Sequence, residues 1–142
     1  MERSSLPVRE IAGQIYASET SNSDLGALHS FRTIEKLAQH LSVPMGPDSF
    51  QSLLARSLSR STVEVPWLGK LRATGTGHLD GLANARATFS ADDISEGEVV
   101  LLTHFLELLV AFIGPSMTLK FVRETWPQLS FDFSDFGNAN ND

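Results

Sequence analysis

The 142-residue chain contains no cysteine, and none of its apolar runs is long enough to cross a bilayer. The absence of cysteine excludes disulfide frameworks, thiolate zinc sites and cysteine nucleophiles. The first residues, Met1 to Pro7, include no apolar signal region, so we expect a cytoplasmic protein. A chain of this length suits one domain with a single hydrophobic core.

Basic residues are scarce in the second part of the chain. Residues 87–142 have a net charge of −7, whereas residues 1–86 have a net charge of +1. Binding to a phosphate backbone depends on positive charge and counterion release, so this balance disfavours nucleic-acid binding. A helix-turn-helix around 25–61 is further disfavoured because the proline-rich break at 42–47 is longer than the usual turn. We expect neither nucleic acid nor a membrane as a partner.

The most informative stretch runs from Val99 to Ile113 and is apolar except at Thr103, His104 and Glu107. A helix that is apolar nearly all round is buried or faces lipid. At roughly 22 Å this one is too short to span a bilayer. We therefore predict a mainly all-α bundle of about five helices around a buried central helix at 97–113. Ser95 and Glu98 have the spacing of a capping box at its start.

Apolar residues at helical spacing predict the other helices, at about 7–19, 25–41, 47–61 and 115–126. The stretch 43–47, which contains two prolines, is expected to end the second of them. Between residues 66 and 90 the sequence does not predict regular secondary structure clearly. We expect Trp67, Leu68 and Leu71 to be buried, and the glycine-rich part is compatible with a short β-hairpin near 70–82. We assign residues 1–128 to one helical domain and 129–142 to an acidic–aromatic tail whose end is expected to be disordered.

Two strings of residues carry a resemblance to known proteins. The first is Phe50-Gln51-Ser52-Leu53-Leu54-Ala55-Arg56 followed by Val65-Pro66-Trp67-Leu68. The second runs from Gly97-Glu98-Val99-Val100-Leu101-Leu102 through Phe112-Ile113-Gly114, Thr118-Leu119 and Val122-Arg123 to Trp126-Pro127. Over roughly residues 31–127 the chain resembles a group of small, stand-alone, mainly helical bacterial proteins of unassigned activity. The resemblance implies a bacterial source and brings no catalytic residues with it.

His104 and Glu107 are three residues apart and therefore share one face of the central helix. A metal site would need further ligands from facing helices, and no second pair at ligand spacing is present, so no metal or cofactor is predicted. The other interpretation is that Thr103, His104 and Glu107 form a narrow polar strip whose hydrogen bonds are made to other groups inside the protein. A buried carboxylate needs a partner, so we expect Glu107 to bind an arginine, with Arg56 and Arg60 as candidates, or to lie at the edge of the bundle.

Arg56 and Arg60 stand one helical turn apart and could together hold an anionic ligand, although such pairs also occur on solvated helix faces. The chain has neither the nucleophile elbow of a serine hydrolase nor a phosphate-binding loop in its proper context. No catalytic residue is assigned.

The sequence favours a non-enzymatic helical module for protein interaction or regulation, with a homodimer as one form. The expected contact residues are Trp67, Trp126, Phe131, Phe133 and Phe136. The last three belong to the tail, which would dock on the domain itself or on a partner. The alternative is a small-ligand or enzyme pocket between helices, near Arg56, His104 and Glu107.

Overall fold

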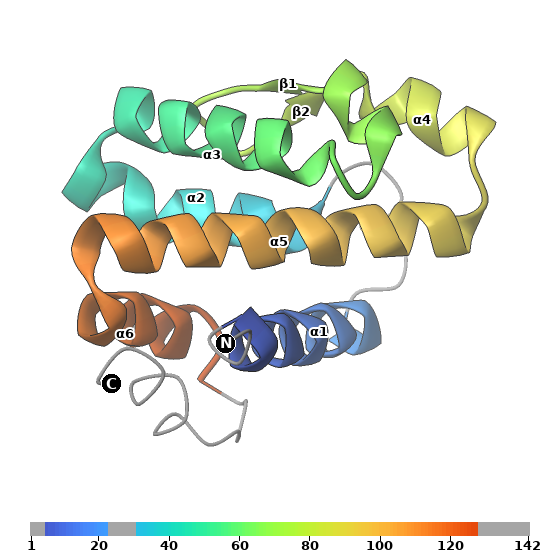
Figure 1. Ribbon diagram of the computed structural model, residues 1–142. Coiled ribbons are helices and arrows are strands. Elements are labelled where there is room, and N and C mark those ends of the chain that lie inside the picture. The colour runs from blue at the N-terminus through green and yellow to red at the C-terminus, as the bar shows by residue number, and fades with distance from the viewer. Residues whose placement is uncertain (1–4, 23–30, 128–142) are drawn as a thin grey trace.

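The computed structural model describes residues 5–22 and 31–127, and in these ranges the fold is mainly all-α, as predicted (Figure 1). Six α-helices, one 3₁₀ helix and a two-stranded antiparallel sheet make up the described chain. The elements are α1 (Ser5–Asn22), α2 (Arg32–Met45), α3 (Pro47–Ser61), η3 (Pro66–Lys70), β1 (Arg72–Ala73), β2 (Leu79–Asp80), α4 (Leu82–Thr88), α5 (Ala91–Ile113) and α6 (Pro115–Thr125). The first part of the predicted helix at 25–41 and the tail at 129–142 lie outside the described residues.

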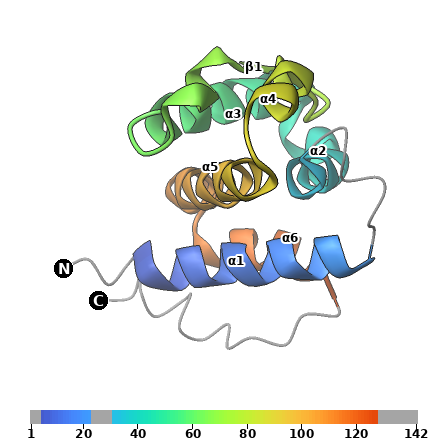
Figure 2. The ribbon, with the colours of Figure 1, turned by 90° about the vertical axis from the view of Figure 1, so that its right-hand side faces the viewer.

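Helix α5 is the central helix of the bundle, as the sequence predicts. It packs against α1, α2, α3, α4 and α6. Figure 2 shows α1 and α6 on one side of it and α3 on the other, with α2 beside it. Between Gly97 and Leu109 its buried residues occupy most of the circumference of the helix, which is why the stretch has only a narrow polar strip in the sequence. Among the described residues, no helix is long and apolar enough to span a membrane.

The start of α5 differs from the prediction. The helix begins at Ala91, and its N-cap is Ser90, whose hydroxyl oxygen accepts a hydrogen bond from the Asp93 backbone N–H at 3.1 Å. Asp92 and Asp93 add negative charge to the first turn, where the helix dipole favours it. The predicted capping box at Ser95 is therefore wrong. Ser95 lies inside the helix and shares a hydrogen bond with the hydroxyl of Tyr16 on α1.

The break between α2 and α3 is shorter than predicted. Helix α2 continues through Pro44 to Met45, and the single residue Gly46 joins it to α3. A proline in the last turn removes only one helical hydrogen bond, so the helix tolerates it there. The helix ends where Gly46 adopts a φ of 84°, a conformation that side chains disfavour.

The segment between α3 and α5 lies across the outside of α3 and the start of α5. The short hairpin pairs Arg72 with Asp80 and Ala73 with Leu79, as the sequence suggested near 70–82. Helix α4 follows it and was not predicted. A Cβ on Gly97 of α5 would lie 2.5 Å from the ring of Trp67, which itself stacks on Phe89. A glycine inside α5 thus lets the indole approach the helix backbone, and Trp67 is half-buried as a result.

Candidate functional site

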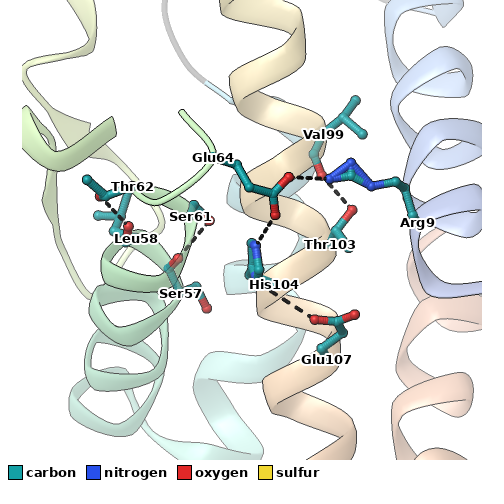
Figure 3. Close-up of polar contacts among 10 residues, drawn as sticks. All are labelled: Arg9, Ser57, Leu58, Ser61, Thr62, Glu64, Val99, Thr103, His104 and Glu107. Atoms are coloured by element: carbon teal, nitrogen blue, oxygen red, sulfur yellow. Dashed lines mark hydrogen bonds and ion pairs between the residues drawn. The ribbon is translucent and has the colours of Figure 1, made fainter. Parts of the chain in front are cut away.

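The polar strip predicted on the central helix is one end of a chain of charged side chains (Figure 3). His104 Nε2 lies 2.9 Å from Glu64 Oε2, in the loop after α3, and His104 Nδ1 lies 3.7 Å from Glu107 Oε1. The other oxygen of Glu64 accepts a hydrogen bond from Arg9 of α1 at 2.7 Å. The hydrogen bond with His104 lowers the pKa of Glu64, burial opposes this shift, and Arg9 lowers the pKa further. The chain of contacts joins α1, the loop and α5.

Glu107 meets the second of its two expectations and not the first. The basic side chain beside it is His104, not Arg56 or Arg60, and this contact is an ion pair only when the imidazole is protonated. The side chain of Glu107 is partly exposed, in agreement with the edge position that was the second expectation. A carboxylate that keeps contact with water does not need a guanidinium partner, which explains why Arg56 and Arg60 remain on the exposed face of α3.

The hydroxyl groups near the strip are already engaged in their own helices. Ser61 donates to the Ser57 carbonyl oxygen at 2.7 Å, and Thr103 donates to the Val99 carbonyl oxygen at 2.8 Å (Figure 3). Each bond reaches back four residues along the same helix, a common way to satisfy a buried hydroxyl. In the described ranges no group of three or more His, Asp or Glu side chains is arranged to hold a metal ion. The contacts of Glu64 with Arg9 and His104 join α1, the loop after α3 and α5, and we call these three residues the clamp.

A buried carboxylate that the sequence analysis did not single out as a site lies at the start of α2. Glu98 of α5 is only 6% exposed, and its Oε2 accepts hydrogen bonds from the Thr33 backbone N–H at 3.2 Å and the Thr33 hydroxyl at 2.7 Å. The N-cap residue of α2 is Phe31, whose side chain cannot accept such a bond. Glu98 thus supplies, from another helix, the acceptor that the first turn of α2 lacks.

A second buried carboxylate, Glu19 of α1, holds the same helix. Its oxygens lie 2.7 Å from Lys36 Nζ and 3.6 Å from Arg32 Nε, and Trp126 donates its indole N–H at 2.9 Å. Burial alone would raise the pKa of Glu19, but the bonds from Lys36 and Trp126 and the two positive charges together lower it. Trp126, which the sequence suggested as a contact residue for a partner, is fully buried in the single chain, where its indole is a core group that binds Glu19.

The environments of the two buried carboxylates shift their pKa values in opposite directions. Burial raises the pKa of Glu98 to about 7, against the bonds from Thr33 and the charge of Arg86, and the charge of Glu19 adds to the rise. A pair of carboxyl groups whose pKa values are shifted apart in this way is common at catalytic sites. Neither carboxylate lines the hollow between α3 and the end of α5, the hollow along α6, or the hollow between α3 and the segment from η3 to β1. Their contacts indicate that they attach α2 to α1, α5 and Trp126.

We expect Glu98→Gln to change how stability depends on pH. The folded protein keeps a proton on Glu98 up to a pKa of about 7, whereas the unfolded chain releases it near the ordinary glutamate pKa of 4.5. This group therefore stabilises the fold fully below about pH 4.5, and that contribution is lost as the pH rises through 7. At 1.36 kcal/mol per unit, the contribution is about 3 kcal/mol.

The measurement is the free energy of unfolding in urea from pH 4.5 to 8 for the wild type, Glu98→Gln and the control Glu96→Gln, an exposed position on the same helix. The free energy of unfolding of Glu98→Gln should fall less over this range than that of the wild type. Above pH 7 the stability of the variant relative to the wild type should therefore be higher than at pH 4.5. Curves of the same shape for all three proteins would show that Glu98 does not titrate as described.

The largest exposed apolar side chain of the described residues is Phe112, on the last turn of α5, which is 63% exposed. The end of α2 and the starts of α3 and α6 lie at this same end of the bundle (Figure 1). They carry two more exposed apolar side chains, Val43 at 89% and Met117 at 43%. We call this end of the molecule, with Val43, Met45, Leu53, Phe112 and Met117, the apolar end.

A hollow of about 270 Å³ lies at the apolar end, between α3 and the last turn of α5. Apolar side chains form part of its wall, and Asp48 and Arg56 bring one charge of each sign to it. This is where the structure places Arg56, and none of the three hollows includes Arg60, His104 or Glu107. The lining residues are Met45, Asp48, Ser49, Ser52, Leu53, Arg56 and Phe112.

Sequence reasoning missed Phe112 as a surface residue because it lies in the same apolar run as the buried residues of α5. The available signal was Gly114-Pro115, which ends the helix directly after Ile113 and so marks the place where the neighbouring helices stop covering it. Of the other contact residues expected from the sequence, Trp67 is half-buried, and Phe131, Phe133 and Phe136 lie outside the described residues.

Comparison with family models, curated proteins and solved structures finds no match to this chain.

Proposed function

We propose that this protein is a helical interaction module that binds other proteins through its apolar end, and that its first partner is a second copy of the chain. The observation that carries the proposal is the exposure of Phe112 at the end of a helix whose middle, residues 97–110, is buried or half-buried. Phenylalanine, methionine and arginine are enriched at protein interfaces, and the hollow beside Phe112 contains all three. Exposed apolar groups gathered in one place are typical of contact surfaces.

The charges of the hollow support a second copy as the partner. Asp48 and Arg56 both line it, eight residues apart on α3. In a twofold dimer the same patch meets itself, so each charge can face the opposite charge of the other copy. Such an arrangement would place Arg56 of one chain near Asp48 of its partner while the Phe112 side chains leave water. The alternative of a ligand pocket near Arg56, His104 and Glu107 has less support, because the hollow that contains Arg56 contains neither of the other two.

Light scattering coupled to size-exclusion chromatography tests this proposal on the full chain. We expect the wild-type molar mass to rise toward twice the monomer value with concentration and the mass of Phe112→Ser to stay near one monomer. The control is Val63→Ser, which removes a side chain that is 86% exposed in the loop after α3, at the other end of that helix. A wild type that is monomeric at every concentration, or an equal loss of mass in both variants, would contradict the proposal.

A further inference from the structure

A second hollow, of about 660 Å³, lies along the outer face of α6. Among the described residues its walls come from one short run of the chain, α6 and the two residues after it, and no second element closes the opposite side. Leu119 gives it an apolar wall, and Lys120 and Arg123 bring two positive charges. The described lining residues are Ser116, Leu119, Lys120, Arg123, Glu124, Trp126 and Pro127.

The chain continues from the wall of this hollow. Pro127 lines it, and two residues later begins Leu129-Ser130-Phe131-Asp132-Phe133-Ser134-Asp135-Phe136. Eight extended residues reach up to about 26 Å. Helix α6 has 11 residues and is therefore about 16 Å long. A segment that starts at Pro127 can thus run back along the whole of α6 to Ser116.

The composition of this segment matches the hollow. Its apolar side chains, Leu129 and three phenylalanines, suit the wall formed by Leu119. Its two aspartates, Asp132 and Asp135, are opposite in charge to Lys120 and Arg123. A segment tethered this closely loses little translational freedom on binding, so moderate contacts are enough to hold it.

We propose that residues 129–136 bind in cis along the outer face of α6 and are the intrachain ligand of this hollow. The phenylalanines of the tail then contact α6 of their own chain and do not bind a partner. The apolar end is the surface that remains exposed for a partner. The proposal does not depend on the proposed function, since it concerns a different hollow and a contact inside one molecule.

The absence of cysteine from the chain allows a direct test by disulfide trapping in the full-length protein. The double variant Ser116→Cys with Ser134→Cys pairs the start of α6 with the tail. The control is Ser59→Cys with Ser134→Cys, because Ser59 is exposed on α3, on the other side of α5 from α6 (Figure 2). In oxidised glutathione we expect an intramolecular disulfide to form about ten times faster or more in the first variant than in the control.

Adding Phe131→Ser, Phe133→Ser and Phe136→Ser to the first variant should bring its rate down to that of the control. Such a loss would show that aromatic contacts, and not the tether alone, hold the segment near Ser116. Equal rates in the two double variants would overturn the proposal. So would a disulfide that forms mainly between two chains, which a gel under non-reducing conditions reveals as a dimer.

Discussion

Phe105→Ala is expected to lower the free energy of unfolding by about 3–5 kcal/mol, the usual cost of truncating a buried phenylalanine. Phe105 is fully buried in the middle of α5, and its ring centroid lies 5.2 Å from that of Phe50 on α3, with the two rings tilted at 52°. The substitution removes this aromatic contact and leaves a cavity between the two helices. Urea unfolding monitored by circular dichroism measures the loss.

Phe112→Ala is the matched control, because it makes the same change seven residues further along the same helix. Phe112 is largely exposed in the single chain, so at a dilution at which the protein is monomeric its truncation should change stability by less than about 0.5 kcal/mol. The pair therefore tests whether the burial of α5 ends before its last turn. Similar losses in the two variants would mean that Phe112 is covered in the isolated chain, and the apolar end would then not be available to a partner.

Trp126→Ala is expected to have an effect of the same size, about 3–5 kcal/mol. The indole is fully buried after the end of α6, and its N–H binds Glu19 at 2.9 Å. Its removal leaves both a cavity and a buried carboxylate with one hydrogen bond fewer. The loss would be measured by urea unfolding at pH 7, where Glu19 is ionised because its pKa is lowered.

Trp126→Phe separates the two contributions, since phenylalanine fills most of the space but donates no hydrogen bond. We expect it to cost about 1.5–3 kcal/mol, which is the range for hydrogen bonds to charged groups. If Trp126→Phe is as stable as the wild type while Trp126→Ala is not, packing alone accounts for the role of Trp126, and the bond to Glu19 contributes nothing.

The sequence was sufficient to predict the helices whose signals are local. The apolar run at 99–113, interrupted only by Thr103, His104 and Glu107, identified the central helix, because a helix that is apolar nearly all round has to be covered by its neighbours. The prolines at 47 and 115 marked the first residues of α3 and α6, where their missing N–H groups are not needed. The capping-box pattern did not identify the first residue of α5. Ser90 and Ser95 are both followed three positions later by an acidic residue, and only Ser90 is the N-cap.

The buried carboxylates could not be found in this way, because their partners are distant in the sequence. Glu98 binds Thr33, 65 residues away, and Glu19 binds Trp126, 107 residues away. In the sequence, Glu98 has the spacing of a capping residue for its own helix. In the structure its carboxylate instead accepts a hydrogen bond from the first turn of α2, because the side chain of Phe31, the N-cap residue of α2, has no acceptor. Only the packing of α5 against α2 reveals this role.

The clamp at His104 was predicted in part. The spacing of His104 and Glu107 correctly placed them on one face, but Glu64 and Arg9 come from a loop and from the first helix. These partners join α1, the loop after α3 and α5. The polar residues of the central helix therefore contribute to its attachment, and we place the proposed contact surface at its end.

Amide chemical shifts recorded during dilution test the central proposal most directly. In spectra of the isotope-labelled full chain, the account predicts concentration-dependent shifts confined to residues near 43–56 and 110–118, with no change around Val63. Shifts that gather around α4 and the hairpin, or spectra that are identical from the lowest to the highest concentration, would contradict it.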